Sequence, residues 1–331
     1  MTQLSDKVVA RLQAEMQVPD LTGTRYRLVR YLARGGMGSV WLVEDTVLQR
    51  RLALKVLDLI APTDDLAARL LQEGRILARL EHPGIVPMHD AGTLLDGRAF
   101  YCMKYVEGQT LTQHTPNKSL PDKLRVVERI AEPLDFAHAR GFIHRDLKPD
   151  NVMIGAFGEV LVMDWGLAKV GVTSLEAGET EIATAVQPTQ NSLRVTGQGS
   201  VVGTRGYMSP EQARGDIEVD HRTDIFSLGA ILTFMLTGSA PGELPAASGS
   251  VPRPLRAICE KAMAADPNAR YQSAREMTAD ITHYLNGEPV SAYPEGLLER
   301  LGRLFTRHRT AVVLVAVYLI MRVLFILFGR R

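Results

Sequence analysis

With 331 residues, the chain is longer than one compact core, which predicts two lobes or domains with an appendage. Hydrophobic residues form 46% of the chain and charged residues 23%, as in ordinary globular proteins, so extensive disorder is not expected. The formal net charge of +1 gives no reason to expect nucleic-acid binding. The two cysteines, Cys102 and Cys259, lie far apart, so we expect no disulfide, no zinc site and a reducing compartment.

Residues 1–25 are expected to form an extension that precedes the main domain. Apolar residues recur at helical spacing over 3–17, which predicts a short amphipathic helix. The first 16 residues contain no continuous apolar stretch, so no signal peptide is expected.

Two short β-type segments, 27–33 and 40–44, enclose the glycine-rich turn 34–39 and predict a hairpin. Glycines let backbone amide groups approach a polyphosphate closely, because no Cβ intervenes. An ordinary hairpin explains the pattern equally well.

A third predicted strand, 51–57, places Lys55 among aliphatic residues. Such a lysine can simply extend its ammonium group to solvent. The next segment, 64–80, has the apolar spacing of a helix and carries Glu73 near its middle. Glu73 can pair with Lys55 and hold it over a nucleotide.

Residues 99–103 predict a buried strand and 121–141 a long helix with Gly141 just past its end. The helix leads into residues 144–151, which read HRDLKPDN. Two short predicted strands, 152–154 and 160–163, then form a hairpin.

The stretch HRDLKPDN resembles the catalytic loop of protein kinases, whose pattern is H-R-D-L-x-x-x-N. Phosphoryl transfer to a hydroxyl needs a carboxylate that accepts the proton and a ligand that holds metal against the phosphates. The resemblance gives Asp146 the first role and Asn151 the second, and Lys148 would neutralise the γ-phosphate. The alternative, a charged surface loop that happens to have this sequence, is a poor explanation of four matching fixed positions.

Further motifs extend the resemblance over residues 26–286, in the order found in kinases. Asp164-Trp165-Gly166 stands where kinases have D-F-G, which implies that Asp164 binds metal. Ala33 stands at the first glycine of the pattern G-x-G-x-x-G-x-V. Residues 203–211, GTRGYMSPE, resemble the block that ends the activation segment of serine/threonine kinases. Thr204 would line the acceptor site, and Glu211 would pair with Arg270.

The chain is thus similar to bacterial eukaryotic-like serine/threonine protein kinases of the membrane-tethered type. The implied fold is α+β, with a β-rich N-lobe (26–103) and a mainly helical C-lobe (104–290) that contains the hinge and the activation segment (164–211). The implied ligands are ATP and Mg²⁺, with Mn²⁺ as an alternative metal, and protein Ser/Thr hydroxyls are the implied acceptors. The expected catalytic residues are Lys55, Glu73, Asp146, Lys148 and Thr204. The expected nucleotide contacts are Leu32, Ala33, Gly35, Gly36, Gly38, Val40, Lys55, Met103, Tyr105 and Val106, and the expected metal ligands are Asn151 and Asp164.

Residues 167–208 are rich in Thr, Ser, Gly and Gln and predict a long loop. In kinases this interval is phosphorylated, and Arg145 is the usual partner of the phosphate. We therefore expect autophosphorylation, with self-association as a route to it. Candidate acceptors that the sequence cannot rank include Thr184, Thr189, Thr196 and Ser200.

Three further helices are predicted at 225–236, 253–265 and 274–286. Asp224 resembles the kinase residue that braces the catalytic-loop backbone, although a helix-cap role explains it equally well. The interval 239–252 is shorter than in most kinases, so an additional helix often used for substrate docking is expected to be reduced or absent.

The C-terminal residues predict a membrane attachment. Residues 291–309 form a basic amphipathic segment next to an apolar run, 310–329, that is interrupted only by Arg322. The run is long enough to cross a bilayer, with an interfacial helix as the alternative. A single-pass protein of the cytoplasmic membrane, with its kinase domain in the cytoplasm and no external domain, is the expectation.

Other classes of protein share parts of this pattern. A small-molecule phosphotransferase would have the nucleotide site but usually lacks the R-D-L-K-P sequence and the acceptor block. A pseudokinase scaffold, or a nucleotide-gated membrane adaptor, would bind partners without catalysis. The substitutions at Ala33 and Trp165 and the short interval 239–252 keep these non-enzymatic alternatives open.

Overall fold

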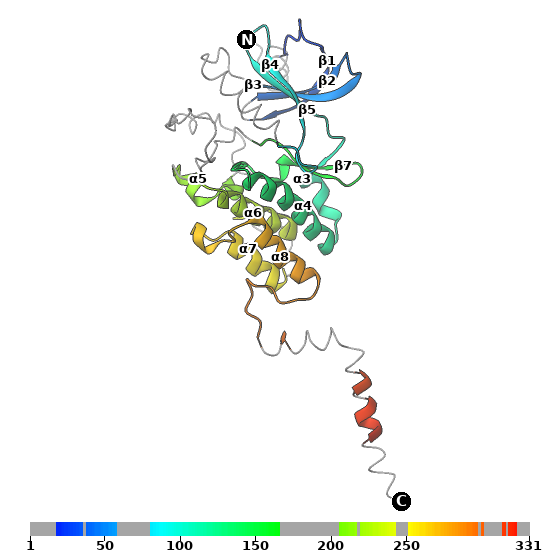
Figure 1. Cartoon of the computed structure of the whole chain (residues 1–331), viewed down its shortest axis with the longest axis vertical. Coiled ribbons are helices and arrows are strands. Elements are labelled where there is room, and N and C mark those ends of the chain that lie inside the picture. Colours follow the sequence, from blue (N-terminus) through cyan, green and yellow to red (C-terminus); the bar gives the residue numbers. More distant parts are fainter. Residues whose placement is uncertain are drawn as a thin grey trace, which may run out of the picture. The chain divides into compact units, whose positions relative to one another are not determined.

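The computed structural model describes residues 18–35, 38–57, 80–165, 205–216, 219–242, 251–296, 299–300, 313–315 and 317–322 (Figure 1). These residues belong to two compact units. The first unit comprises the described parts of 1–117 and 132–189, and the second comprises those of 118–131 and 190–331.

The first unit contains a five-stranded antiparallel sheet in the order β1-β2-β3-β5-β4. Its strands are β1 (Tyr26–Gly35), β2 (Gly38–Asp45), β3 (Arg50–Leu57), β4 (Met88–Thr93) and β5 (Ala99–Lys104). The four strands predicted in this region, 27–33, 40–44, 51–57 and 99–103, are confirmed as parts of β1, β2, β3 and β5. The fifth strand, β4, begins at Met88, and Ile85 before it forms an isolated bridge with Val162.

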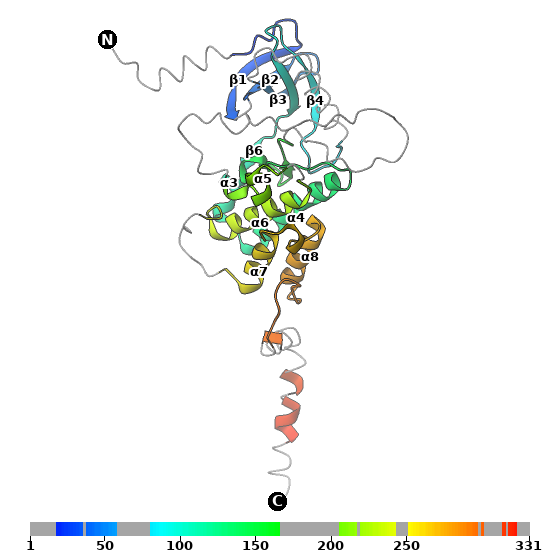
Figure 2. The same ribbon diagram turned by 90° about the vertical axis from the view of Figure 1, so that its left-hand side faces the viewer.

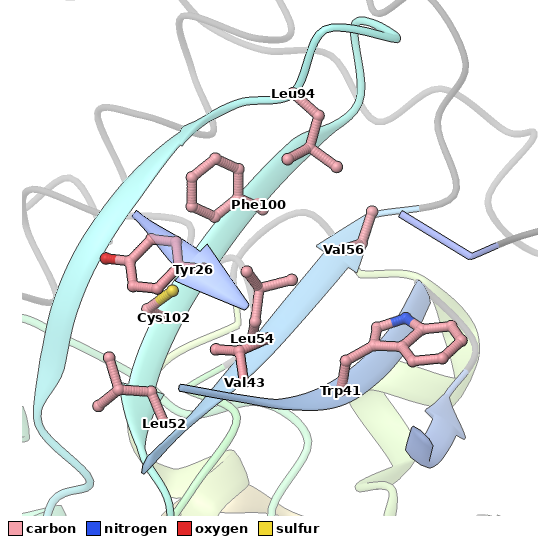
Figure 3. Packing of buried hydrophobic residues seen from close by; sticks show 9 residues of the cluster. All are labelled: Tyr26, Trp41, Val43, Leu52, Leu54, Val56, Leu94, Phe100 and Cys102. Carbon is pink, nitrogen blue, oxygen red and sulfur yellow. The ribbon is translucent and has the colours of Figure 1, made fainter. Parts of the chain in front are cut away.

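One face of this sheet packs into an apolar core, because side chains alternate between faces along each strand. Figure 3 shows nine members of this core, which come from the strands and from the turn after β4. They are Tyr26, Trp41, Val43, Leu52, Leu54, Val56, Leu94, Phe100 and Cys102. Each fully buried aliphatic or aromatic side chain contributes about 1.5–3 kcal/mol of transfer free energy.

A second, three-stranded sheet in the first unit has the order β6-β7-β8. The predicted hairpin is confirmed as β7 (Val152–Gly155) and β8 (Val160–Val162). The sequence did not predict β6 (Gly108–Thr110) or the one-turn helix α3 (Leu111–His114) that follows it. A 3₁₀ turn, η1 (Thr115–Asn117), continues from α3.

The long predicted helix is confirmed as α4, Leu120–His138. Its C-terminal turn satisfies the last carbonyl groups with two backbone bonds, Phe142 N–H to Ala137 O and Gly141 N–H to His138 O. Gly141 has a φ of +79°, so glycine is needed at this position, as expected.

The second unit is helical (Figure 2). Besides the part of α4 up to Ala131, its helices are α5 (Pro210–Arg214), α6 (Arg222–Thr237), α7 (Arg253–Ala262) and α8 (Ala274–Leu285), with 3₁₀ turns η4 (Arg205–Tyr207) and η5 (Pro267–Ala269). The last three helices pack against one another. The predicted helices are confirmed, but α6 begins three residues before the expected position, and α5 and η4 were not predicted.

Several predictions fall wholly or largely outside the described residues. These are the helices at 3–17 and 64–79, most of the loop 167–208, the interval 243–250 and most of 297–331. Leu80, the last residue of the second expected helix, is described and is not helical. Residues 313–315 and 317–322 are helical, and no helix among the described residues has both the length and the apolar character needed to span a membrane.

Candidate active site

Asp146 lies in the loop between α4 and β7, and its carboxylate is held from within the same loop. Lys148 donates from Nζ to Asp146 Oδ2 over 2.7 Å. Asn151 donates from Nδ2 to Asp146 Oδ2 over 3.2 Å and to the Asp146 carbonyl over 2.7 Å. Asn151 is positioned by the 3₁₀ turn η2 (Pro149–Asn151), where Pro149 fixes the backbone at the start of the turn. The HRDLKPDN loop therefore brings together three of the predicted site residues, Asp146, Lys148 and Asn151.

The hydrogen bonds to Asp146 leave one carboxylate oxygen available. Among the described residues, both side-chain bonds go to Oδ2. The carboxylate side chain is 49% exposed, so Oδ1 can accept a hydrogen bond from a molecule outside the loop.

His144 connects this loop to the residues that precede Asp164. Its Nδ1 accepts the Asp146 N–H over 3.3 Å, and its Nε2 lies 2.9 Å from the carbonyl of Met163. A neutral imidazole with its proton on Nε2 satisfies both contacts. The Met163 N–H in turn donates to the Asn151 carbonyl over 2.8 Å, so two backbone segments are fixed to each other.

Trp165 anchors the turn that carries Asp164. Its indole N–H donates to the Val162 carbonyl over 3.2 Å, and its ring lies 4.9 Å from the His144 ring. The side chain is buried. Tryptophan therefore retains the apolar anchor of the predicted D-F-G position and adds a donor that phenylalanine lacks.

Lys55 on β3 reaches Asp164, with 2.6 Å between Nζ and Oδ1. Its side chain is only 11% exposed, so the prediction of a buried functional lysine is favoured over a lysine that extends to solvent. Tyr101 on β5 lies directly across from Lys55 and donates its hydroxyl to the same Oδ1 over 3.3 Å. Asp164 itself has a φ of +49°, in the left-handed region that few non-glycine residues adopt.

The glycine-rich turn joins β1 and β2 as predicted, with Gly35 opposite Gly38. A Cβ on Gly38 would lie 2.0 Å from the Val56 carbonyl oxygen, so close packing on β3 requires glycine here. Leu32 and Ala33 lie on β1, and Val40 pairs with both Ala33 and Lys55 across the sheet. The backbone register therefore places Val40 next to the lysine and Ala33 one strand further along the sheet.

The three predicted hinge-side residues lie at and after the end of β5. Met103 is on the strand opposite Ala53, and its side chain follows Tyr101 on the same face. Val106 is buried, and Tyr105 accepts a hydrogen bond from Arg30 over 3.3 Å.

Three predicted site residues, Gly36, Glu73 and Thr204, lie outside the described residues, so the Lys55–Glu73 pair and the acceptor site stay predictions. The predicted pair of Glu211 and Arg270 in the second unit is confirmed, with two bonds of 2.6 and 2.7 Å. Asp224 is buried in the first turn of α6, after the N-cap position, so the helix-cap interpretation is wrong.

The donor set fits a hard divalent cation. Asn151 uses its amide nitrogen on Asp146, which leaves its oxygen for a metal. The hydrogen bonds to Asp164 from described residues both go to Oδ1, which leaves Oδ2. Mg²⁺ is usually held by one or two protein ligands and completes its shell with phosphate oxygens and water.

The sequence analysis missed Tyr101. Two signals pointed to it: Tyr101 is two residues before Met103 on a predicted strand, and β-strand side chains repeat with a period of two. Once the register is known, a tyrosine directly across from the predicted nucleotide-binding lysine is a candidate residue of the site.

The fold and the loop that carries Asp146 are those of a protein kinase domain. The protein kinase domain family matches residues 26–289, and the chain belongs to this family. It therefore has the family's two-lobed fold, with a β-sheet small lobe and a mainly helical large lobe.

Relatives and solved structures agree with this assignment. The chain is 36% identical over 299 residues to serine/threonine-protein kinase PknD of Chlamydia felis, covering 80% of this chain and 31% of the relative. It is 37% identical over 302 residues to serine/threonine-protein kinase PknB of Mycobacterium tuberculosis, covering 84% and 45%. The crystal structure of the M. tuberculosis PknI kinase domain matches with a TM-score of 0.57 and 28% identity, covering 79% of this chain and 96% of that domain. The chain thus spans about a third to a half of the length of these curated relatives.

Proposed function

We propose that the chain is a serine/threonine protein kinase that transfers the γ-phosphate of Mg-ATP to protein hydroxyls. The observation that carries the proposal is the Asp146 carboxylate, held through Oδ2 by Lys148 and Asn151 with Oδ1 left to accept a proton. The names of the relatives, which are serine/threonine-protein kinases, support the same conclusion.

In the proposed reaction, Asp146 accepts the proton of a Ser or Thr hydroxyl and orients the oxygen of that hydroxyl towards the γ-phosphorus. The new bond joins that oxygen to phosphorus, the bond from phosphorus to the β–γ bridging oxygen breaks, and ADP leaves. Lys148 lies 2.7 Å from Asp146, so its ammonium group is placed to neutralise charge on the transferred group.

We infer that Lys55 neutralises the α- and β-phosphates, supported by Glu73, while the backbone around Gly35, Gly36 and Gly38 covers the phosphates. Leu32, Ala33, Val40, Met103, Tyr105 and Val106 would line the adenosine. Asn151 and Asp164 would hold Mg²⁺, or Mn²⁺ in its place, which when bound neutralises the phosphates.

Two features favour Ser/Thr acceptors over tyrosine. Lys148 follows Asp146 by two residues, and GTRGYMSPE places Thr204 at the acceptor site, as in serine/threonine kinases. We further propose that the segment 164–211 is autophosphorylated between associated copies, with Arg145 as a partner of the phosphate.

For the C-terminus, we propose a tether to the cytoplasmic membrane, with 310–329 as a single spanning helix and the kinase domain in the cytoplasm. The apolar run, interrupted only by Arg322, and the basic segment 291–309 before it support this proposal. If the run spans the bilayer, the protein stays in the membrane fraction after an alkaline carbonate wash. Release into the supernatant would favour an interfacial helix instead.

The central test compares the full chain with Asp146→Asn, incubated with Mg-ATP and a generic basic protein. We expect phosphorylated Ser and Thr with the parent chain and a loss of about 10²–10⁴-fold in rate for the variant. Asp96→Asn, in the β4–β5 turn, is the surface control and keeps full activity. Binding of ATP without any phosphate transfer by the parent chain would instead favour the pseudokinase scaffold.

A further inference from the structure

Tyr101 shares the Lys55 face of the five-stranded sheet. Phe100 and Cys102, its neighbours on β5, belong to the apolar core on the opposite face (Figure 3). Since successive side chains of a strand alternate, Tyr101 points away from that core. It is also the direct cross-strand partner of Lys55.

The contacts of Tyr101 converge on one oxygen. Its hydroxyl lies 3.3 Å from Asp164 Oδ1, the atom that Lys55 Nζ approaches to 2.6 Å. The Lys55 ammonium also lies 5.7 Å from the centre of the Tyr101 ring, within the range of cation–π attraction. Among the described residues, Asp164 is the sole hydrogen-bond partner of the hydroxyl.

Asp164 needs to be held because its backbone has a φ of +49°. Left-handed backbone costs a non-glycine residue about 1–2 kcal/mol, so the turn is maintained by its contacts. Trp165 fixes the turn from one side through Val162, and Tyr101 and Lys55 fix the carboxylate itself.

A tyrosine hydroxyl has one proton to donate, and the Tyr101 hydroxyl directs it to Asp164 Oδ1. The Lys55 ammonium, by contrast, is expected to bind phosphates once a nucleotide enters. The Tyr101 hydroxyl has no phosphate to bind, so it does not have to divide its contacts between Asp164 and the nucleotide.

We propose that Tyr101 is a positioning residue for the metal ligand Asp164, holding Oδ1 so that Oδ2 is presented to the cation while Lys55 engages the nucleotide. The inference rests on the proposed function, because it assigns Asp164 to the metal. The hydroxyl is not needed for packing, since phenylalanine has the same ring. The distance of 3.3 Å is long for an O–H···O bond, so a modest effect is expected.

The test measures metal affinity directly. Mn²⁺ is titrated into the full chain with a non-hydrolysable ATP analogue, and free Mn²⁺ is followed by electron paramagnetic resonance. Tyr101→Phe is expected to weaken Mn²⁺ binding about threefold to tenfold, which is the range for one hydrogen bond. Its affinity for the analogue in EDTA, and its unfolding midpoint, stay at the parent values.

Tyr26→Phe is the matched control. It removes a tyrosine hydroxyl from the same sheet, one that donates to Asp90, and its ring packs edge-on against Phe100. We expect this variant to bind Mn²⁺ as the parent chain does.

Three results would overturn the inference while leaving the proposed function intact. They are an unchanged Mn²⁺ affinity in Tyr101→Phe, an equal loss in Tyr26→Phe, and a loss of metal-free nucleotide binding in Tyr101→Phe, which would indicate general damage to the sheet. A parent chain that binds no Mn²⁺ with the analogue and transfers no phosphate would overturn the proposed function, and this inference with it.

Discussion

The Lys55–Asp164 pair in the first unit and the Glu211–Arg270 pair in the second differ in how fully their polar atoms are used. Arg270 binds both oxygens of Glu211, at 2.6 and 2.7 Å, and its remaining donors reach three backbone carbonyl groups. The two side chains are 0% and 8% exposed. Every part of the guanidinium is therefore committed to fixed partners.

Among the described residues, Lys55 makes one hydrogen bond, to one oxygen of Asp164, and the carboxylate is 31% exposed. Lysine has three donors and Asp164 has a second oxygen, so both groups can bind further partners without losing the first. A fully saturated, buried ion pair therefore serves as a brace. An unsaturated pair at an accessible position can instead take part in binding and exchange.

The largest expected effect follows from breaking the brace. Glu211→Ala leaves the Arg270 charge buried without its partner and should lower the free energy of unfolding by about 3–5 kcal/mol. Urea denaturation of the full chain measures this loss.

The matched variant replaces both partners, Glu211→Leu with Arg270→Met, and should lose much less, because no charge remains buried. If the double variant is as unstable as Glu211→Ala, the buried charge is not the cause of the loss, and the Glu211–Arg270 pair is not a brace.

Breaking the unsaturated pair should affect catalysis and spare the fold. Lys55→Met is expected to lower kcat/KM for phosphate transfer by about 10²–10³-fold, the range for removing one preorganised electrostatic contact. Its unfolding midpoint should stay close to the parent value. Arg51→Met, an exposed cation on the same strand, is the control, and undiminished activity in Lys55→Met would contradict the assigned role.

The sequence predicted those parts of the fold that have a visible period or a fixed motif. The strands around the glycine-rich turn, the hairpin 152–163 and the three longest helices wholly within the second unit were all predicted, and so was the Glu211–Arg270 pair. The elements that were missed, β6, α3 and α5, have three to five residues, which is too short to show a period.

Contacts between distant segments needed the structure. Tyr101 and Asp164 are 63 residues apart, and only the register of β5 against β3 places the hydroxyl beside the carboxylate. In the same way, the start of α6 was expected too late because its first turn is polar and buries Thr223 and Asp224 in place of apolar side chains.

A smaller effect distinguishes the two supports of Asp164, which are the Trp165 anchor of the turn and the Lys55 contact with the carboxylate. Trp165→Phe keeps an aromatic anchor but deletes the bond of 3.2 Å to the Val162 carbonyl. The expected loss is about 1 kcal/mol of unfolding free energy, with phosphate transfer retained. Thermal unfolding and a transfer assay on the same sample measure both. A large loss of activity at unchanged stability would show that the indole donor, and not only the Lys55 contact, sets the position of Asp164.

The smallest expected effect is the acid sensitivity of the brace. Burial by itself would raise the pKa of Glu211, but the hydrogen bonds from Arg270, from the backbone and from Ser209, together with the charge of Arg270, outweigh it and hold that pKa below the ordinary glutamate value. A carboxyl group with a lowered folded-state pKa stabilises the fold fully above its unfolded-state pKa, and the contribution is lost as the pH falls through the folded-state pKa. Urea unfolding of the parent chain and of the Glu211→Leu, Arg270→Met double variant is therefore measured from neutral pH downwards. The difference between their unfolding free energies should be constant at first. It should then shift against the parent chain as the pH falls through the folded-state pKa of Glu211. A difference that moves in favour of the parent chain on acidification would mean that Glu211 takes up its proton more readily in the folded state, and the saturated pair would then not be the charged brace that the geometry implies.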